Sequence, residues 1–380
     1  MDRPFRIGLD FREAFREDPR GIGLYCRHLM REYGEIRPEM EFLLFHERGL
    51  PGDMPEIPEF MQPHRLEIKG GRYHLWERLA LPLRLRSEGI DLYHGTYNTL
   101  PPWLPLPGNP KMVVTLHDIL VTWMGEDLQD PFVRYARKVT GRVVRQADAI
   151  LTVSEFSKQD ILRRYPCDPD KVRVVHNGIH PLFHVDAPED DVDAMRQRIT
   201  GGRPYIFVVG SALDRKNSDI LFPLFRRLVA EGLPDDTLLV MSSLTGESLE
   251  RRRQAAREVG VEADCRLLGY QSWEDLRLLY SGAMFSVYPS LAEGWGIPVV
   301  ESLACGTPVA TSERTAMPEA GGDFGRYFDP ESLDSVTQAC QDLIGGLDSF
   351  PTEAAQQFAR GFSWKACAEK TLDVYRELLP

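Results

Sequence analysis

The chain has 380 residues, enough for two domains of ordinary size, with a hydrophobic fraction of 43% and a charged fraction of 27%. No apolar run approaches the ~18 residues of a membrane span, so an integral membrane protein is not expected. The net charge of −12 falls within residues 186–380, since residues 1–185 hold equal numbers of acidic and basic side chains. This balance argues against nucleic acid as a partner.

The cysteines and the N-terminus bear on the compartment. The six cysteines are scattered and include no Cys-x-x-Cys pair, so we expect a reducing environment and no zinc site. The N-terminal residues lack the apolar core of a signal peptide. A cytoplasmic location is therefore expected.

The chain opens with a predicted strand at residues 5–9, followed by a charged loop, Gly21-Ile22-Gly23 and a helix over residues 24–34. A Gly-x-Gly turn after a first strand is typical of nucleotide-binding folds. The third glycine of a dinucleotide fingerprint is missing, so that motif is not supported. The two glycines either shape a turn or allow close approach to a ligand.

The next apolar runs predict four strands and one helix. The strands are expected at residues 41–45, 66–69, 91–94 and 111–116, and the helix over residues 73–87. His117 directly follows the last of these strands. Open parallel sheets bind ligands at the carboxyl ends of their strands, which makes His117 a candidate site residue. A lone histidine is also commonly structural, so the residues alone leave both interpretations open.

A helix over residues 132–146, a strand at 149–154, a helix over 157–165 and a strand at 172–175 follow. Two of the predicted helices concentrate basic and aromatic side chains: Arg72, Tyr73, Trp76, Arg78, Arg84, Arg86, Arg134, Tyr135, Arg137, Lys138, Arg142 and Arg145. We hypothesise a peripheral contact with an anionic membrane, at the inner face of the cell membrane. Two solvated helix faces explain the same residues.

The acidic residues 186–193 are expected to belong to the interdomain connection. A buried strand at residues 205–210 follows, and then Arg215 and Lys216 at the start of a helix. A helix N-terminus repels cations, so two of them there suggest a bound anion, with solvated surface charges as the alternative. Pro223 predicts a kink in this helix.

Strands at residues 238–242 and 265–268 continue the alternation of strands and helices, and Gly269 and Tyr270 follow the second of them. The last predicted helix opens at residues 362–364 and ends near Leu379.

Residues 286–310 lie between the strand at 265–268 and the last helix. They predict a strand, a glycine-bearing loop, a short helix with Pro298 in its first turn, and a further strand. Glu293 lies in the loop and Glu301 lies one turn inside the helix. The loop amides and the helix N-terminus would suit a diphosphate, with Glu301 accepting hydrogen bonds from a ribose. Alternatively, Glu301 complements the helix dipole and Glu293 is solvated.

This stretch resembles the signature of retaining GT-B glycosyltransferases, in particular glycosyltransferase family 4. The signature has two glutamates separated by seven residues and a Gly-x-Pro-Val ending. The matching residues are Glu293, Gly294, Trp295, Gly296, Ile297, Pro298, Glu301, Ala304, Cys305, Gly306, Thr307, Pro308 and Val309. Residues 21–25, 115–118, 149–161, 171–179 and 214–217 are also similar to elements of the family, so the likeness covers nearly the whole chain.

The resemblance implies an α/β protein of GT-B architecture, with two Rossmann-like domains whose parallel sheets face each other across a cleft. Residues 1–185 are expected to form the acceptor-side domain and residues 186–361 the donor domain. The C-terminal helix, residues 362–380, is expected to cross back onto the N-terminal domain.

The resemblance also implies residue roles. Glu301 would bind the ribose, Glu293 and His117 would lie near the hexose, and Gly269 and Tyr270 would hold the nucleobase. The implied catalytic residues are His117, Arg215, Lys216 and Glu293. The implied donor-binding residues are Gly23, Arg215, Lys216, Gly269, Tyr270, Glu293, Gly294, Trp295, Gly296, Ile297 and Glu301.

The implied reaction moves a hexose, with retention, from a nucleotide diphosphate sugar to a hydroxyl of a glycan or lipid-linked acceptor in polysaccharide or glycoconjugate synthesis. A GDP-mannose-like donor is expected first and a UDP-hexose second. No cofactor is expected, and no metal, because Arg215 and Lys216 supply positive charge to the leaving group.

Three alternatives share these features. A sugar-nucleotide epimerase would need no acceptor, and a retaining disaccharide phosphorylase would use inorganic phosphate in place of the nucleotide. A non-catalytic subunit would bind the donor without turnover, which the paired glutamates and the Arg-Lys pair disfavour.

Overall fold

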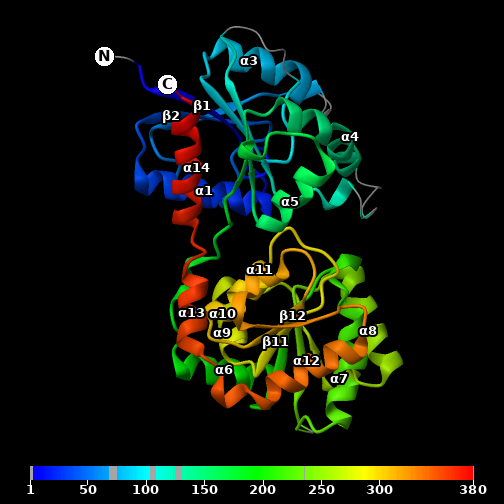
Figure 1. Ribbon diagram of the computed structural model, residues 1–380. Helices are drawn as coiled ribbons and strands as arrows, with labels where there is room; N and C mark the ends of the chain where they lie inside the picture. Colours follow the sequence, from blue (N-terminus) through cyan, green and yellow to red (C-terminus); the bar gives the residue numbers. More distant parts are fainter. Residues whose placement is uncertain are drawn as a thin grey trace. The chain divides into compact units, whose positions relative to one another are not determined.

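The computed structural model describes residues 3–67, 75–102, 108–122, 124, 131–234 and 236–379. The chain forms two compact units (Figure 1). Unit 1 comprises Met1–Asn177 together with Trp364–Pro380, and unit 2 comprises Gly178–Ser363. The chain therefore leaves unit 1 before the acidic stretch and returns to it for the last helix.

Unit 1 is built on a parallel sheet whose described strands run in the order β3-β2-β1-β4-β5-β6-β7. The strands are β1 (Phe5–Asp10), β2 (Met40–His46), β3 (Met61–Arg65), β4 (Leu92–Gly95), β5 (Lys111–Leu116), β6 (Ala149–Thr152) and β7 (Val172–Val174). The direction of winding reverses between β1 and β4, which is where sheets of this kind bind ligands.

The strand predicted at residues 66–69 is misplaced. The observed strand is β3, which ends at Arg65, and residues 68 and 69 lie outside the described residues. β3 includes Pro63, which cannot donate a backbone hydrogen bond, and it lies at an edge of the sheet, where this loss is tolerated. Because proline argues against a strand, the sequence pattern did not predict one at these residues.

Helices cover both faces of this sheet. The helical segments are α1 (Ile22–Ile36), the π-helical η1 (Trp76–Ala80), α3 (Leu81–Ser87), η2 (Leu120–Thr122), α4 (Pro131–Gln146), α5 (Glu155–Arg164), η3 (Pro169–Lys171) and α14 (Trp364–Leu378). Of the helix expected over residues 73–87, residues 73 and 74 lie outside the described residues, and residues 76–80 are π-helical because Pro82 cannot donate to the turn before it.

The core of unit 1 divides along the two faces of the sheet. Ile7 and Leu9 of β1 pack with side chains of α1 and α14 on one face, whereas Tyr93 of β4 packs with η1, α3, α4 and α5 on the other. Successive residues of a strand point to opposite faces, so a sheet covered on both sides needs nearly continuous apolar strands.

Unit 2 is built in the same way. Its described strands run in the order β10-β9-β8-β11-β12-β13, all parallel, and reverse their winding between β8 and β11. The strands are β8 (Tyr205–Val209), β9 (Leu238–Ser242), β10 (Cys265–Leu267), β11 (Phe285–Tyr288), β12 (Val309–Ser312) and β13 (Gly325–Phe328). Apolar side chains of β8, β9, β11, α7, α8 and α12 form a common core.

The helices of unit 2 connect its strands. The α-helices are α6 (Glu189–Thr200), α7 (Leu221–Ala230), α8 (Gly246–Val259), α9 (Trp273–Ser281), α10 (Ile297–Ala304), α11 (Met317–Gly321), α12 (Leu333–Gly345) and α13 (Thr352–Arg360). The 3-10 turns are η4 (Pro181–His184), η5 (Asp214–Lys216), η6 (Ser218–Ile220), η7 (Glu262–Asp264), η8 (Gly322–Phe324) and η9 (Leu347–Ser349).

Two expectations about unit 2 need correction. The acidic stretch does not simply connect the units, because Glu189 to Asp191 form the first turn of α6, where carboxylates complement the helix dipole. Pro223 does not kink a longer helix. It lies in the first turn of α7, where its missing N–H would be unpaired in any case.

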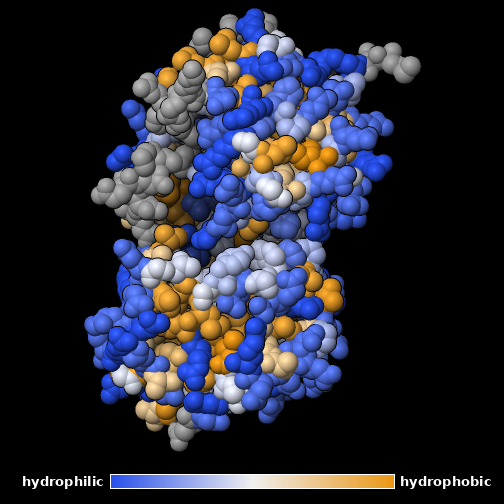
Figure 2. Space-filling model, turned by 180° about the vertical axis from the view of Figure 1, so that it is seen from behind, coloured by the Kyte–Doolittle hydropathy of each residue, from blue (hydrophilic) through white to orange (hydrophobic). Residues whose placement is uncertain are grey.

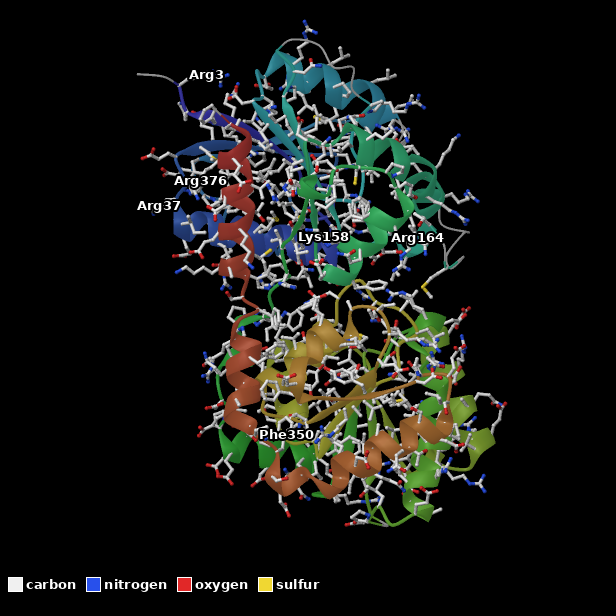
Figure 3. All side chains as sticks on the ribbon, viewed as in Figure 1. Arg3, Arg37, Lys158, Arg164, Phe350 and Arg376 are labelled. Atoms are coloured by element: carbon white, nitrogen blue, oxygen red, sulfur yellow. The ribbon has the colours of Figure 1, made fainter. Side chains whose placement is uncertain are left out.

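Hydrophilic and apolar residues share the visible surface. Figure 2 shows hydrophilic residues over much of one face, with apolar residues dispersed over unit 1 and gathered in a broader area of unit 2. Side chains such as Arg3, Arg37 and Arg376 lie at the surface of unit 1 (Figure 3).

Candidate active site

The switch point of unit 2 brings two distant segments together. η5, with Arg215 and Lys216, follows β8, and the loop of residues 289–296 follows the neighbouring strand β11. Since both strands are parallel, the two segments emerge at the same edge of the sheet. The chain is tied there by a hydrogen bond from the Leu291 N–H to the Arg215 carbonyl, at 2.7 Å.

Glu293 is buried between the two cations. Its Oε2 lies 2.6 Å from Nη1 of Arg215, and its Oε1 contacts Nζ of Lys216. Burial alone would raise the pKa of Glu293, but Lys216 and Arg215 outweigh burial and hold that pKa below its ordinary value. Glu293 is therefore an ionised carboxylate paired with two cations.

The loop around Glu293 is held at several points. Nη1 of Arg215 also donates to the Ala292 carbonyl at 2.9 Å, and the Glu293 N–H donates to Oγ1 of Thr315 at 3.0 Å. A Cβ on Gly296 would lie 2.6 Å from the Cβ of Ala320, so only glycine fits where the loop enters α10. These contacts place the loop and the N-terminus of α10 beside η5.

Glu301 lies inside α10 and is buried. The Tyr280 hydroxyl donates to its Oε2 at 3.1 Å and lies 2.8 Å from the hydroxyl of Tyr288. Burial raises the pKa of Glu301 to about 8, although Tyr280 and Lys216 act to lower it. A carboxyl group with this pKa exchanges its proton near neutral pH.

Gly269 and Tyr270 lie farther along the same edge. They follow β10, which is separated from β8 by β9. The side chain of Tyr270 is 64% exposed, and the Gly269 carbonyl accepts from the Ser243 N–H at 2.9 Å. Tyr270 thus presents an accessible aromatic face, at the same sheet edge as η5.

In unit 1, His117 follows β5 and is held by the loop after β4. Its backbone N–H donates to Oδ1 of Asn98 at 2.8 Å, and its Nε2 lies 3.2 Å from the Thr96 carbonyl. A carbonyl oxygen only accepts, so Nε2 carries the hydrogen and Nδ1 is the acceptor. Burial lowers the pKa of His117 to about 4, so the ring is neutral at pH 7.

A chain of buried polar groups supports His117, and sequence reasoning missed it. The Tyr25 ring meets the His117 ring edge-on at 4.8 Å, and its hydroxyl lies 3.0 Å from Oγ1 of Thr115. The same Oγ1 lies 2.7 Å from Nε2 of His94, whose Nδ1 lies 2.6 Å from the Tyr375 hydroxyl. His94 is the last residue of a predicted strand, and His117 directly follows another, so a histidine at a strand's carboxyl end was the available signal.

Gly23 has a packing reason to be glycine. A Cβ at this position would lie 2.6 Å from the Glu13 carbonyl oxygen, so α1 could not approach the loop after β1. Gly21, with φ of 47°, precedes α1 in a conformation that favours glycine. The turn interpretation of these glycines therefore accounts for both residues.

Comparisons with known proteins agree with this architecture. Residues 19–181 match the model described as Glycosyltransferase Family 4, and residues 191–345 match Glycosyl transferases group 1. The chain belongs to glycosyltransferase family 4. This glycosyltransferase is 28% identical to O-antigen chain mannosyltransferase B of Escherichia coli, over 94% of this chain and 96% of that protein. It is also 28% identical to a D-inositol 3-phosphate glycosyltransferase of Salinispora tropica, over 95% and 81% of the two chains.

Solved structures support the GT-B fold of the glycosyltransferase. Sucrose-phosphate synthase from Thermosynechococcus elongatus superposes with a TM-score of 0.78 at 20% identity, over 98% of this chain and 99% of that one. Anabaena HepE in complex with UDP-glucose superposes with a TM-score of 0.72 at 15% identity, over 98% and 99%.

Two features are absent from the described residues of the glycosyltransferase. None of their helices combines the length and apolar character needed to cross a bilayer. Among the same residues, no group of three or more His, Cys, Asp or Glu side chains is arranged to hold a metal ion.

Proposed function

We propose that this glycosyltransferase moves a hexose, with retention, from a nucleotide diphosphate sugar to a hydroxyl of a glycan or lipid-linked acceptor. The observation that carries the proposal is the convergence of Arg215, Lys216 and Glu293 at the switch point of unit 2, beside the N-terminus of α10. Two cations and a helix N-terminus at one place favour a diphosphate.

Arg215 and Lys216 would stabilise the departing nucleotide diphosphate. Charge grows on the phosphate oxygen as its bond to the anomeric carbon breaks, and fixed positive groups stabilise that charge. Their contacts with Glu293 hold the two cations side by side at this edge of the sheet. The positive charge of these two side chains would make a metal ion unnecessary.

In the proposed reaction, the acceptor oxygen attacks the anomeric carbon on the face that the phosphate leaves. The acceptor's O–H proton passes to the departing phosphate oxygen, while the new glycosidic bond forms. We assign no protein nucleophile. Glu293, held by two cations, would lie beside the hexose and hydrogen-bond its hydroxyls.

The remaining donor contacts would be divided between α10 and the neighbouring loops. Glu301 would face the ribose hydroxyls, and the amides of residues 294–297 would face the diphosphate and the sugar. Tyr270, exposed after β10, would stack on the base beside Gly269. In unit 1, His117, with Nδ1 as an acceptor, and Gly23, at the start of α1, remain the residues proposed to act near the hexose.

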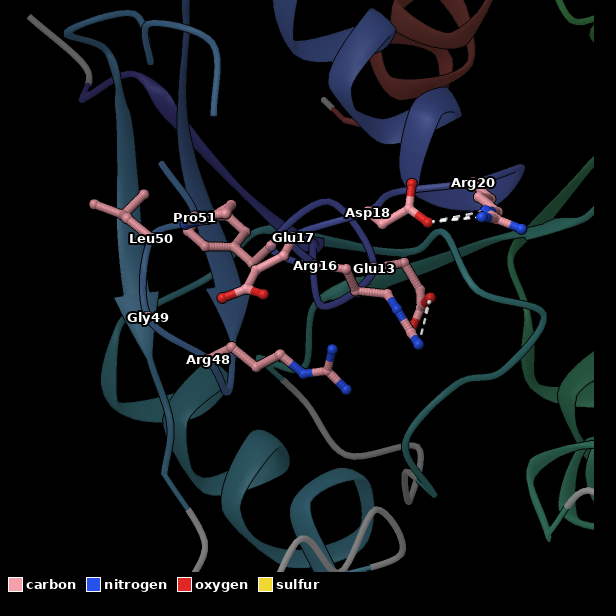
Figure 4. Close-up of a pocket in the computed structure, with 10 residues that line it drawn as sticks. Glu13, Arg16, Glu17, Asp18, Arg20, Arg48, Gly49, Leu50 and Pro51 are labelled. Atoms are coloured by element: carbon pink, nitrogen blue, oxygen red, sulfur yellow. Dashed lines mark hydrogen bonds and ion pairs between the residues drawn. The ribbon is translucent and has the colours of Figure 1, made fainter. Parts of the chain in front are cut away.

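The acceptor would bind unit 1. A cavity of about 770 Å³ lies between the loop after β1 and the loop after β2. Figure 4 shows the Arg16–Glu13 and Arg20–Asp18 contacts on one side of this cavity and Arg48 on the other. Paired carboxylates and guanidinium groups can accept from and donate to sugar hydroxyls.

A GDP-mannose-like donor is proposed first, on similarity to relatives named as mannosyltransferases. A UDP-hexose comes second, since HepE, a relative in fold, was solved with UDP-glucose. Synthesis of a polysaccharide or glycoconjugate is the setting that the names of these relatives suggest. We propose a cytoplasmic location for it, at the inner face of the cell membrane.

Thermal unfolding with GDP, UDP and ADP tests the proposal on the wild type and on Lys216→Ala. A ligand that binds only the folded state raises the melting temperature, so one base should give a selective shift that the variant loses. Asp236→Ala, an exposed change away from η5, is the control and should keep the shift. No shift with any nucleotide would overturn the proposal and favour a phosphate-dependent phosphorylase.

A further inference from the structure

Four cationic side chains line one pocket of unit 1. The pocket, of about 540 Å³, is lined by Arg78 of η1 and by Arg134, Lys138 and Arg142 of α4, with Tyr135 and Val139 among its other walls. Positions 134, 138 and 142 are four residues apart and share one helix face, where like charges destabilise the helix. Negative charge nearby, from the protein or from a ligand, would offset this repulsion between the cations.

The protein itself supplies little compensating charge. Glu77, the buried carboxylate beside the pocket, accepts from Thr99 at 2.6 Å and from Tyr135 at 2.8 Å, and lies 3.7 Å from Nη2 of Arg142. Among the described residues, Arg78, Arg134 and Lys138 have no carboxylate within ion-pair distance. Three of the four cations therefore lack an ion-pair partner within the part of the chain that the structure describes.

This is unusual for a chain with 57 acidic and 45 basic side chains. Elsewhere, exposed arginines meet carboxylates readily, as in Arg84–Glu88, Arg227–Asp334 and Arg257–Glu262. The contrast identifies the pocket as a local positive field within an acidic protein, which attracts anions.

The surroundings of the pocket indicate what kind of anion fits. Guanidinium forks and a lysine ammonium together are suited to phosphate oxygens. Leu79 and Leu83, one turn apart and adjacent to Arg78, are 58% and 72% exposed. An anionic group attached to an apolar chain would satisfy both features.

The pocket also lies close to the loops of the proposed reaction centre in unit 1. Arg142 donates to the Leu100 carbonyl at 3.0 Å, and Pro102 of the same loop lines the pocket. This loop follows β4, and His117 follows the neighbouring strand β5. A phosphate held here would keep the rest of an acceptor near the sheet edge that carries His117.

We propose that this pocket binds a phosphate or diphosphate group of the acceptor. The proposal rests on the proposed transferase function and adds the chemical class of the acceptor. The same phosphate chemistry can come from a soluble sugar phosphate or from a lipid headgroup, and the experiment separates the two.

The test uses the full chain carrying Lys216→Ala, so that binding of phosphate at η5 is weakened. Isothermal titration with inorganic pyrophosphate compares this background with one that adds Arg134→Ala and Lys138→Ala. Loss of two charge-assisted contacts should weaken binding about tenfold or more. The matched control adds Arg137→Ala and Arg145→Ala, which remove the same charge from exposed positions of α4 outside the pocket, and should change affinity less than about twofold.

The outcomes are distinct. Equal weakening by both double variants would mean that only net charge matters, and unchanged binding in the pocket variant would exclude the site. Either result would overturn the proposal. Circular dichroism melting of each variant excludes unfolding as the cause, and the GDP and UDP shifts of chains with native Lys216 report separately on the donor site.

Sedimentation with vesicles then identifies the source of the phosphate. If it is a lipid headgroup, phosphatidylglycerol vesicles should sediment the wild type more than phosphatidylcholine vesicles do. Both the pocket variant and Leu79→Ser/Leu83→Ser should lose that difference. The alternative is a soluble phosphate. It is assigned if pyrophosphate binding depends on the pocket while vesicle binding is either absent or unaffected by these changes.

Discussion

The Tyr375 hydroxyl lies 2.6 Å from Nδ1 of His94, although 281 positions separate the two residues in the chain. Tyr375 belongs to the last helix, α14, and His94 to β4 in the centre of the unit 1 sheet. Through Thr115 and Tyr25, the contact continues to His117. The last helix therefore contributes directly to the support of the candidate histidine.

Replacing Tyr375 by Phe should lower the free energy of unfolding by about 1–3 kcal/mol, because a buried ring nitrogen of His94 loses its partner. Denaturant unfolding measures the change. Tyr165→Phe is the control, since Tyr165 is half-buried and its hydroxyl has no hydrogen-bond partner among the described residues. A loss of the same size in both variants would contradict a specific role for the Tyr375–His94 contact.

Acid should destabilise unit 1 through His94 and His117. Burial lowers the pKa of His94 to about 3 and that of His117 to about 4, whereas both would take up protons near pH 6.5 when unfolded. Their contribution to stability is therefore complete above pH 6.5 and is lost as the pH falls toward 4. The expected slope is about 1.4 kcal/mol per pH unit for each histidine.

Unfolding titrations between pH 7 and 4.5 measure this slope, and His94→Gln should reduce it. A wild-type stability that stays flat over this range would contradict the buried neutral state of the two rings.

Glu301 should give a pH dependence of opposite sign. Burial raises the pKa of Glu301 to about 8, so the folded state favours its protonated form, and stability is lost as the pH rises from about 4.5 through 8. Glu301→Gln keeps the shape and can still pair with Tyr280, but cannot ionise. The variant should be more stable than the wild type at pH 9, by about 1 kcal/mol or more.

The same variant should bind the nucleotide more weakly, because an amide replaces the carboxylate proposed to face the ribose. Thermal melting at pH 6 and pH 9, with and without nucleotide, measures both effects. Equal melting temperatures of variant and wild type at pH 9 would contradict the raised pKa.

Glu293→Gln should separate binding from catalysis. An ionised Glu293 competes with a diphosphate for Arg215 and Lys216, so its neutral replacement should bind nucleoside diphosphates a few-fold more tightly. Transfer should fall by about 100-fold if the carboxylate acts beside the hexose. Calorimetry with nucleoside diphosphate and an assay of nucleotide release measure the two effects, with exposed Glu274→Gln as the control. Weaker nucleotide binding in Glu293→Gln would reject the competition.

Gly296→Ala should disturb the loop before α10. The new Cβ would lie 2.6 Å from the Cβ of Ala320, so the loop must move, at a cost of about 1–3 kcal/mol in stability. Gly345→Ala, in α12, meets nothing within 4 Å and should be neutral or slightly stabilising. The rise in melting temperature on nucleotide binding should be reduced in Gly296→Ala and unchanged in Gly345→Ala. If Gly296→Ala keeps both its stability and this rise, the loop can accommodate the methyl group and the expectation is wrong.

Local chemistry in the sequence was sufficient for much of the fold. Apolar runs predicted buried parallel strands, because a strand covered on both faces has no polar side. Pro298 and Gly306 predicted the start and end of α10, because proline suits a first helical turn and glycine, here with φ of 76°, suits the residue after a helix. The errors concerned Pro63 and Pro223. The effect of a proline depends on whether it lies in an edge strand, as Pro63 does, or in the first turn of a helix, as Pro223 does.

Contacts between distant residues required the tertiary structure. The spacing of Glu293 and Glu301 was visible in the sequence, but the ion pair of Glu293 with Arg215, 78 residues away, follows from β8 and β11 being neighbours. The pKa of Glu301 depends on burial that no spacing reveals. Helical hydrogen bonds and the alternation of side chains along a strand are local or periodic, whereas strand order and side-chain burial are properties of the whole unit. The sequence by itself therefore determined the elements and the candidate residues, and only the tertiary structure decided which of them meet and which carry charge.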